Sequence, residues 1–260
     1  MDLRIAGNAA VVVGGISGIG RACVEAFREE NVRVAVWDIA SDDHLPEDVL
    51  YVPVDVTDEA AVVRAAERTQ EHFQGIRHLV HAAAIGSGRF GFPFTNLSPA
   101  DWDRVLNVNI RGTVNVAHAV APLMSAAGNG TMVFVASVAA QIGSPTDPPY
   151  SASKAANINF AQVMARDLAA AGVRVNTVCP GMVRTPLNQS VWRAWNDRQA
   201  EENRKSYNDW ASEKIRQLIP LNRWQEPADI ADMILFLSSD RSRQVTGQTI
   251  NVDGGYVMHW

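Results

Sequence analysis

The stretch Val11-Val-Val-Gly14-Gly15-Ile-Ser-Gly18-Ile-Gly20 decides the fold, because an apolar run leads through a glycine-rich turn into a helical pattern. We expect that helix to begin near Ser17 and to end near Glu30. Glycines let the backbone turn tightly and approach a pyrophosphate, and the helix N-terminus offers unpaired N–H groups to the anion. A glycine turn alone also suits a purely structural connection, so this interpretation needs support from elsewhere. The predicted contacts to a dinucleotide are Gly14, Ser17, Gly18, Ile19 and Gly20.

Short apolar runs rich in Val and Ile recur along the chain and alternate with longer helical patterns. Runs without polar alternation suit strands buried on both faces, and strands that alternate with helices imply right-handed crossovers. The sequence therefore predicts one α/β domain over residues 1–260, a doubly wound parallel sheet of about seven strands with helices on both faces. The predicted strands cover residues 9–14, 32–38, 50–54, 77–83, 131–136, 173–179 and 249–252.

The composition favours a globular protein and argues against several functions. The chain has 260 residues, of which 47% are hydrophobic and 20% charged, which is enough to bury a substantial core. A net charge of −5 without any Lys- and Arg-rich stretch argues against a nucleic-acid partner. No stretch approaches the roughly 18 uninterrupted apolar residues of a membrane span, so we expect a cytoplasmic protein with no membrane partner. Cys23 and Cys179 lack metal-ligand spacing, and we expect two reduced thiols and no metal site.

Asp38 ends the apolar run Val34-Ala-Val-Trp-Asp38, which follows the glycine-turn helix. A carboxylate in this place can accept hydrogen bonds from the ribose hydroxyls of an adenosine, and it would repel a 2′-phosphate. The one nearby cation, Arg21, lies within the first turn of the helix. Asp38 therefore supports the dinucleotide loop and predicts NAD rather than NADP.

Tyr150 and Lys154, in the stretch Tyr150-Ser-Ala-Ser-Lys154, fall on one face of a helix. A phenol has a pKa of about 10 and is a poor acid or base at neutral pH, but a fixed ammonium nearby favours the phenolate. The pair therefore suits a proton-transfer site. Alone it also suits a solvated helix face, so its interpretation depends on the other motifs.

The spacing Gly-x-x-x-Gly-x-Gly, joined to Tyr-x-x-x-Lys, resembles the short-chain dehydrogenase/reductase family over essentially the whole chain. The resemblance implies a Rossmann-type fold and an NAD-dependent oxidoreductase that interconverts a secondary alcohol and a ketone. Further family landmarks appear in order: Asp55-Val56, Asn109 in Asn107-Val-Asn109-Ile, Ser137 in Val135-Ala-Ser137, Pro180-Gly181 and Val252-Asp-Gly-Gly255.

The resemblance implies a catalytic role for four residues. Tyr150 would act as general acid and base, and Lys154 would lower its pKa and hold the nicotinamide ribose. Ser137 would polarise the substrate oxygen, and Asn109 would position a water that links Lys154 to solvent.

The resemblance also implies further cofactor contacts, with one departure from the family pattern. Asp55 and Val56 would meet the adenine, and Val183 and Thr185 would bind the carboxamide. The family's Asn-Asn-Ala-Gly is replaced here by His81-Ala82-Ala83-Ala84. Backbone contacts from Ala82 or Ala83 would survive, whereas Ala84 puts a methyl group where the backbone passes close to the cofactor.

The stretch 182–221 separates two core elements and contains several tryptophans, so we expect a helical substrate lid there. Trp192 and Trp195 suit either substrate stacking or a helix core, and Arg193 or Arg198 could pair with an anionic group. The wall around Tyr150 is predicted from residues 86–94, 139–144 and 148–149. The sequence leaves the alcohol or ketone substrate unnamed.

Two other functions stay open beside the alcohol dehydrogenase. One is an acyl-carrier-protein-type 3-ketoacyl reductase, which Asp38 and the uncharged stretch 125–131 disfavour. The other is a non-catalytic NAD-binding sensor, which would be free to lose Ser137, Tyr150 or Lys154. The family also suggests a homo-oligomer, with a tetramer favoured, built through helices at about residues 101–127 and 151–171.

Overall fold

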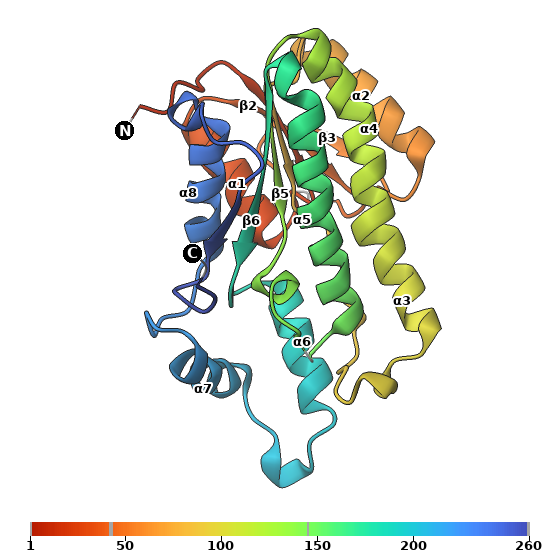
Figure 1. Ribbon diagram of the computed structural model, residues 1–260, viewed down its shortest axis with the longest axis vertical. Coiled ribbons are helices and arrows are strands. Elements are labelled where there is room, and N and C mark those ends of the chain that lie inside the picture. The colour runs from red at the N-terminus through yellow and green to blue at the C-terminus, as the bar shows by residue number, and fades with distance from the viewer. Residues whose placement is uncertain (1, 42–43, 145, 259–260) are drawn as a thin grey trace.

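The computed structural model describes residues 2–41, 44–144 and 146–258 and contains a seven-stranded sheet (Figure 1). All strand pairs are parallel, in the order β3-β2-β1-β4-β5-β6-β7. The expected doubly wound α/β fold is therefore confirmed. The strands are β1 (Ala9–Val13), β2 (Arg33–Asp38), β3 (Leu50–Pro53), β4 (His78–His81), β5 (Gly130–Val135), β6 (Val173–Pro180) and β7 (Thr249–Val252).

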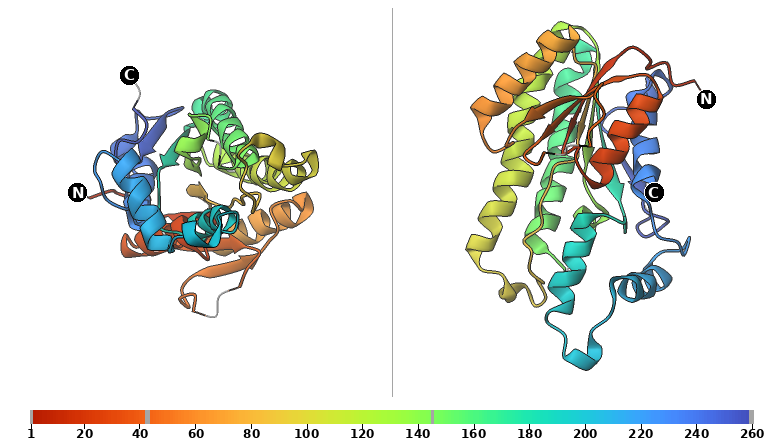
Figure 2. Two further views of the ribbon diagram at one scale, coloured as in Figure 1. Left: turned by 90° about the horizontal axis from the view of Figure 1, so that it is seen from below. Right: turned by 180° about the vertical axis from the view of Figure 1, so that it is seen from behind.

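Helices cover both faces of the sheet, as the apolar, non-alternating strands require (Figure 2). One face packs against α2, α4 and α5, and the other packs against α1 and α8, so that two separate apolar cores form. The helices are α1 (Gly18–Glu29), α2 (Glu59–Phe73), α3 (Pro99–Leu106), α4 (Gly112–Ala126), α5 (Pro148–Leu168), α6 (Pro186–Asn196), α7 (Tyr207–Leu218) and α8 (Pro227–Ser238). Within the described parts of the chain, no helix is both long and apolar enough to cross a membrane.

The long helix expected at residues 101–127 contains a turn that the sequence does not predict. A π-helical turn over Asn107–Arg111 joins α3 to α4. Such turns are rare within α-helices and occur often at functional sites. Its central residue, Asn109, is fully buried, and so the turn points one amide side chain into the interior.

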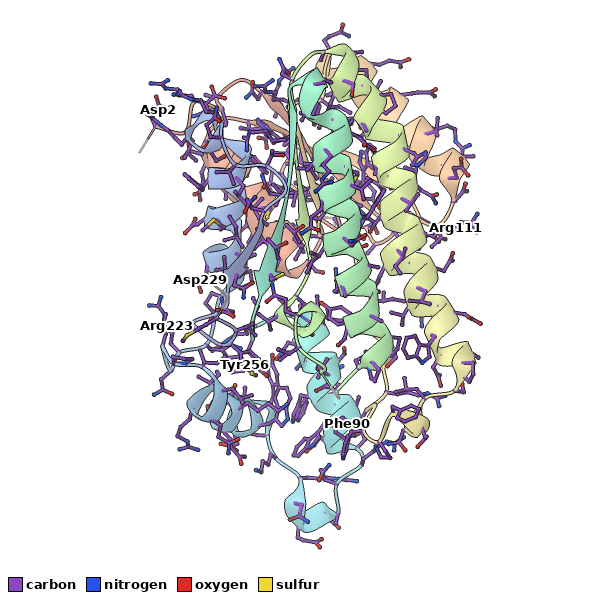
Figure 3. All side chains as sticks on the ribbon, in the orientation of Figure 1. Asp2, Phe90, Arg111, Arg223, Asp229 and Tyr256 are labelled. Carbon is purple, nitrogen blue, oxygen red and sulfur yellow. The ribbon has the colours of Figure 1, made fainter. Side chains whose placement is uncertain are left out.

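The expected lid, residues 182–221, forms α6 and α7 beyond the carboxyl ends of the strands (Figure 1). Trp192 lies 5.6 Å from Tyr207 between ring centroids, and Trp195 lies 6.4 Å from Trp210. Tyr256, from the C-terminal segment, packs against the same aromatic cluster beside α7 (Figure 3). The aromatic rings therefore hold α6, α7 and the C-terminal segment together.

Candidate active site

A cleft of about 630 Å³ opens at the carboxyl ends of the central strands, within the size range of cofactor sites. Ligands of open parallel sheets bind at this edge, where the strand order reverses. Here the reversal lies between β1 and β4, because the chain adds β2 and β3 on one side of β1 and β4 on the other. The sequence-predicted residues that line the cleft are Gly14, Ser17, Gly18, Ile19, Gly20, Asp38, Asp55, Val56, Ala82, Ala83, Ser137, Tyr150, Lys154, Val183 and Thr185.

The glycine turn packs too closely for side chains at two of its positions. Gly14 has a φ of +81°, and a Cβ atom there would lie 2.6 Å from the Ala83 nitrogen. A Cβ atom on Gly20 would lie 2.0 Å from the Gly14 oxygen, so this glycine brings α1 close to the turn. Ser17 caps α1 without a side-chain hydrogen bond. The first N–H groups of α1 therefore face the cleft and are not bonded to a capping side chain, which leaves them able to bind an anion.

Asp38 is held at the end of β2 by two backbone donors. Its Oδ2 accepts from the Ile16 N–H at 3.1 Å, and its Oδ1 accepts from the Ala40 N–H at 3.0 Å. The carboxylate is thus fixed between the glycine turn and the segment after β2. The nearby Arg21 side chain forms an ion pair with Glu25 at 2.9 Å, one turn along α1.

Thr185 and Asp55, which the sequence predicts as cofactor contacts, are each held by hydrogen bonds in the cleft lining. Thr185 caps α6 by accepting from the Asn188 N–H at 3.2 Å, so its hydroxyl has a structural task. Its methyl group would lie 3.3 Å from a Cβ atom on Gly18. Asp55 accepts from the N–H and the hydroxyl of Thr57 at 2.9 and 2.8 Å, which fixes the turn after β3.

Tyr150, Lys154 and Ser137 come together because α5 begins beside the end of β5. The Lys154 Nζ lies 5.6 Å from the centroid of the Tyr150 ring and donates to the Val135 carbonyl at 2.6 Å. The Ser137 hydroxyl accepts from the Ala139 N–H at 3.1 Å and lies close enough to the Tyr150 hydroxyl to oppose the rise of its pKa. The amine, the phenol and the hydroxyl thus line one part of the cleft.

Burial shifts the pKa of both ionisable groups in this cluster. Loss of hydration raises the pKa of Tyr150, the hydrogen bond with Ser137 opposes the shift, and the charge of Asp147 adds to it. Burial lowers the pKa of Lys154 to about 8. Dehydration of the phenolate is therefore the largest influence on the pKa of Tyr150 in this structure, and the lowering by Lys154 that the resemblance implies stays a prediction.

Asn109 lies behind the cleft rather than on its surface. Its side chain accepts from the Ile85 N–H at 2.9 Å and donates to the Ile85 carbonyl at 2.9 Å and to the Ser153 hydroxyl at 3.0 Å. Its own backbone carbonyl accepts from the Asn157 side chain at 3.0 Å. The side chain thus ties the segment after β4 to α5, close to the residues of the cleft.

Comparison with known proteins agrees with this arrangement. A family model described as enoyl-(acyl carrier protein) reductase matches residues 14–257. The 3-oxoacyl-(acyl-carrier-protein) reductase FabG of Thermotoga maritima is 33% identical over 265 residues, which cover 98% of this chain and 100% of that protein. The D-threitol dehydrogenase of Mycolicibacterium smegmatis is 31% identical over 269 residues, which cover 99% and 95%.

This protein belongs to the short-chain dehydrogenase/reductase family. A solved structure, the aldohexose dehydrogenase of Thermoplasma acidophilum, matches with a TM-score of 0.87 at 26% identity, over 98% of this chain and 95% of that one. Like other members of the short-chain dehydrogenase/reductase family, it is an oxidoreductase that uses a nicotinamide dinucleotide on a small-molecule substrate.

The departure from the short-chain dehydrogenase/reductase pattern at His81–Ala84 is accommodated without loss of the cleft. His81 is fully buried and stacks on Phe134 with ring centroids 5.9 Å apart. Among the described residues, none bonds to its Nε2 atom. Ala84 lines the cleft, and so its methyl group becomes part of the wall.

The lid contributes side chains to the cleft, but not the ones that the sequence suggested. Leu187, Asn188 and Val191 of α6 are cleft-lining residues. Trp192 instead donates from its indole N–H to the Lys205 carbonyl at 3.0 Å, inside the aromatic cluster. Among the described residues that line the cleft, there is no tryptophan of the lid and neither Arg193 nor Arg198. The helix-core interpretation of these tryptophans is therefore the correct one.

Sequence reasoning missed one charged residue of the site, Asp147. It caps α5 directly before Pro148 and is 7% exposed. Asp147 lines the cleft together with Tyr150, and its carboxylate accepts from the Ser87 N–H at 2.8 Å. The Asp-Pro-Pro sequence is a typical helix start and could have identified the cap, although not its place in the cleft. No three His, Cys, Asp or Glu side chains of the described chain gather in a way that would hold a metal ion.

Proposed function

We propose that this protein is an NAD(H)-dependent oxidoreductase that interconverts a secondary alcohol and a ketone, with Tyr150 as general acid and base. The observation that carries the proposal is one cleft shared by Tyr150, Lys154, Ser137 and Asp38. Asp38 ends β2, and Tyr150 lies beside β5, so β1 and β4 separate the two groups. An extended dinucleotide would reach from a ribose at Asp38 to a nicotinamide at Tyr150.

The residues present fit such a cofactor. The close backbone packing at Gly14 and the uncapped start of α1 at Ser17 suit a pyrophosphate, and Lys154 would hold the second ribose. The bound nicotinamide would supply or accept the hydride. Asp55, Val56, Val183 and Thr185 line the same cleft, which supports their proposed contacts to the adenine and the carboxamide.

The protein groups would handle the proton and the oxygen of the substrate. Tyr150 would take the hydroxyl proton of an alcohol, or return it to a ketone. The Ser137 hydroxyl already accepts from the Ala139 N–H, which leaves its own proton free to be donated to the substrate oxygen. Two hydrogen bonds would thus fix the reacting oxygen above the phenol.

Lys154 would stabilise the phenolate through its charge and by its fixed position. Its bond to the Val135 carbonyl holds the amine in the interior, where the effective dielectric constant is low and the field at Tyr150 is strong. Its lowered pKa of about 8 means that the ammonium can also release a proton near neutral pH. Asn109 would position a water beside Lys154, and its bonds to Ile85 support a positioning role.

Asp38 would select NAD over NADP. We expect the wild-type protein to have a higher kcat/KM with NAD than with NADP. Asp38→Ala should narrow that preference by about tenfold, because it removes the acceptor for the ribose hydroxyls and the charge that repels a 2′-phosphate. Steady-state kinetics with both cofactors test this. Asp58→Ala, at the exposed cap of α2, is the control and should leave the preference unchanged. Equal use of NAD and NADP by the wild type would contradict the assignment.

A second candidate is reduction of a 3-oxoacyl thioester, favoured by the likeness to the Thermotoga maritima reductase. The purified protein should be mixed with NAD and a panel of secondary alcohols, and with NADH and ketones or an acetoacetyl thioester, while the absorbance of the reduced cofactor is followed. Turnover of alcohols and simple ketones supports the proposal. Turnover of the thioester alone would replace it with the second candidate, and cofactor binding without any turnover would indicate a sensor.

We also propose that residues 182–221 act as a substrate lid and that the protein is a homotetramer. The position of α6 over the cleft supports the lid. The exposed Val163 on α5 and the groove along the π-helical turn, lined by Leu106, Ile110 and Val114, support an interface through α4 and α5. Sedimentation velocity on the purified chain tests the tetramer.

A further inference from the structure

We propose that Asp147 selects the substrate, and that the substrate is a neutral alcohol with a second hydroxyl group on the carbon next to the reacting carbinol. The inference rests on the proposed function and names the substrate class of the same site. It starts from a buried carboxylate in the cleft wall beside Tyr150 and Ser137.

The Asp147 carboxylate is held rigidly from two sides. Its Oδ2 accepts from the Ser87 N–H at 2.8 Å, and its Oδ1 accepts from the Tyr150 N–H at the longer distance of 3.4 Å. The neighbouring Gly91 N–H donates to the Thr146 carbonyl at 2.9 Å, so the loop after β4 is joined to the start of α5 at two points. A substrate group would therefore meet a carboxylate whose position is fixed before binding.

The carboxylate has spare acceptor capacity and lacks a counter-charge. An ionised carboxylate has about four lone-pair positions, and the backbone donors from Ser87 and Tyr150 use two directions. Among the described residues, no Lys or Arg forms an ion pair with Asp147. A buried charge is costly unless hydrogen bonds compensate for it. A hydroxyl group of the substrate would donate to one of the remaining acceptor positions.

The neighbours of Asp147 narrow the substrate further. Ile85, Leu187 and Val191 give the cleft apolar walls. Asn188 accepts from the Tyr207 hydroxyl at 2.8 Å through its Oδ1, so its NH₂ group remains as a donor in the cleft wall. Acceptor and donor groups thus lie around the phenol within an apolar frame, an arrangement that suits a compact molecule with several hydroxyl groups.

The same carboxylate disfavours two other substrate classes. A carboxylate or phosphate next to the carbinol would be repelled by the buried charge of Asp147. A 3-oxoacyl thioester presents only carbonyl acceptors beside its reacting group, and these would face the acceptor oxygens of Asp147 without a hydrogen bond. A vicinal diol avoids both conflicts.

The reaction balances for such a diol. The carbinol C–H bond breaks and its hydride passes to NAD, the carbinol proton passes to Tyr150, and an α-hydroxyketone and NADH form. The second hydroxyl keeps its proton and donates it in a hydrogen bond to Asp147 throughout. The carboxylate thus binds and orients the substrate and takes no part in the redox step.

Matched pairs of alcohols test the inference: a cyclohexanediol with adjacent hydroxyls against cyclohexanol, and the vicinal butanediol against 2-butanol. We expect wild-type kcat/KM to be at least about tenfold higher for each diol, because a hydrogen bond to a charged group is gained. Asp147→Asn, which keeps an acceptor for Ser87, should bring each diol close to its mono-alcohol. The ratio within each pair cancels any change in the acidity of Tyr150, which affects both members alike.

Asp58→Asn is the matched control, because Asp58 caps α2 as Asp147 caps α5 and accepts from the Ala61 N–H at 3.0 Å. It should leave every ratio unchanged. Equal wild-type kcat/KM for diol and mono-alcohol would overturn the inference and leave the proposed function intact. A merely structural role would lower both members of each pair equally in Asp147→Asn and would also overturn it. Binding of NAD without oxidation of any of the four alcohols would count against the proposed function itself.

Discussion

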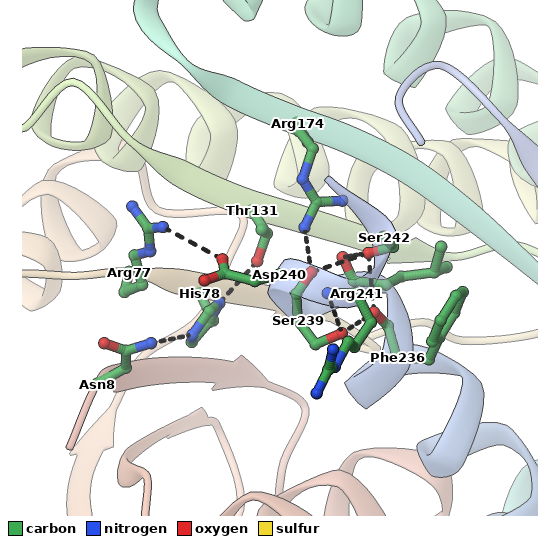
Figure 4. Close-up of polar contacts among 11 residues, drawn as sticks. Asn8, Arg77, His78, Thr131, Arg174, Phe236, Ser239, Asp240, Arg241 and Ser242 are labelled. Atoms are coloured by element: carbon green, nitrogen blue, oxygen red, sulfur yellow. Dashed lines mark hydrogen bonds and ion pairs between the residues drawn. The ribbon is translucent and has the colours of Figure 1, made fainter. Parts of the chain in front are cut away.

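The two ends of the sheet each bury a histidine from the same strand, β4, in different surroundings. At the amino end, the ring of His78 bonds through Nε2 to the Asn8 side chain at 3.1 Å and through Nδ1 to the Thr131 hydroxyl at 2.8 Å (Figure 4). At the carboxyl end, His81 stacks on Phe134, and its Nε2 has no hydrogen-bond partner among the described residues. Both ring nitrogens of His78 are therefore hydrogen-bonded, whereas the Nε2 atom of His81 can still form a hydrogen bond.

The same contrast extends to the groups around each histidine. At the amino end, Arg174 donates to the Ser239 carbonyl at 3.0 Å, and the Ser242 hydroxyl bonds to the same carbonyl at 3.0 Å (Figure 4). Arg174 also donates to the Val245 carbonyl at 3.1 Å. At the carboxyl end, Tyr150 has a raised pKa. The hydrogen bonds around His78 and Arg174 stabilise the fold, and the cleft at the carboxyl end holds groups that can act on a ligand.

The strongest test removes one oxygen atom at the carboxyl end. We expect Tyr150→Phe to lower turnover at least about a hundredfold, or about 2.7 kcal/mol in the barrier, because the group that exchanges the substrate proton is lost. NAD binding and the free energy of unfolding should change little. Tyr256→Phe, outside the cleft lining, serves as the control. Stopped-flow or steady-state kinetics give the answer, and an unchanged turnover in Tyr150→Phe would rule out Tyr150 as the proton-transfer residue.

A second test concerns how the protonation of His78 and His81 changes stability with pH. Burial lowers the pKa of each from 6.5 to about 3. The unfolded chain therefore binds more protons than the folded chain between pH 6.5 and about 3. The stability that each histidine contributes is complete above pH 6.5 and is lost as the pH falls through this window.

Urea unfolding at a series of pH values between 6.5 and 4 measures this effect. In the wild type, each histidine should add up to about 1.4 kcal/mol per pH unit to the slope of the unfolding free energy. We expect His81→Phe to remove one such contribution to the slope. At pH 7 the variant should be as stable as the wild type, because the substitution leaves no hydrogen-bond partner of His81 unpaired. The same slope in the variant and the wild type would show that His81 is not buried in its neutral form.

Much of the site could be predicted from the sequence because the motifs are local. Gly14 and Gly20 follow β1 and Asp38 ends β2, and the parallel fold brings the carboxyl ends of these two strands to one edge. Tyr150 and Lys154 share a helix face by periodicity alone. Neighbouring strands and helices thus bring such residues together without any long-range detail.

The parts that could not be predicted depend on contacts between distant segments. Asp147 reaches the cleft because it bonds to Ser87, 60 residues earlier in the chain. The role of Trp192 was decided by its packing against Tyr207 on the next helix. The Tyr150 pKa depends on how deeply the phenol is buried, which the helical spacing to Lys154 does not reveal.

A smaller effect should separate two hydroxyl groups at opposite ends of β5. Thr131, in the strand, bonds to His78, whereas Ser137, just beyond it, lines the cleft with Tyr150. Thr131→Val keeps the shape of the side chain but leaves the His78 ring with an unpaired nitrogen in the interior. We therefore expect the free energy of unfolding to fall by about 1–2 kcal/mol. The kcat/KM of this variant should stay within about twofold of the wild-type value. Ser137→Ala should instead lower kcat/KM by about tenfold or more, because a donor to the substrate oxygen is lost. Paired urea unfolding and kinetic measurements on the two variants test this assignment, and a kinetic defect in Thr131→Val with none in Ser137→Ala would show that the ends of the sheet do not divide stability and chemistry in this way.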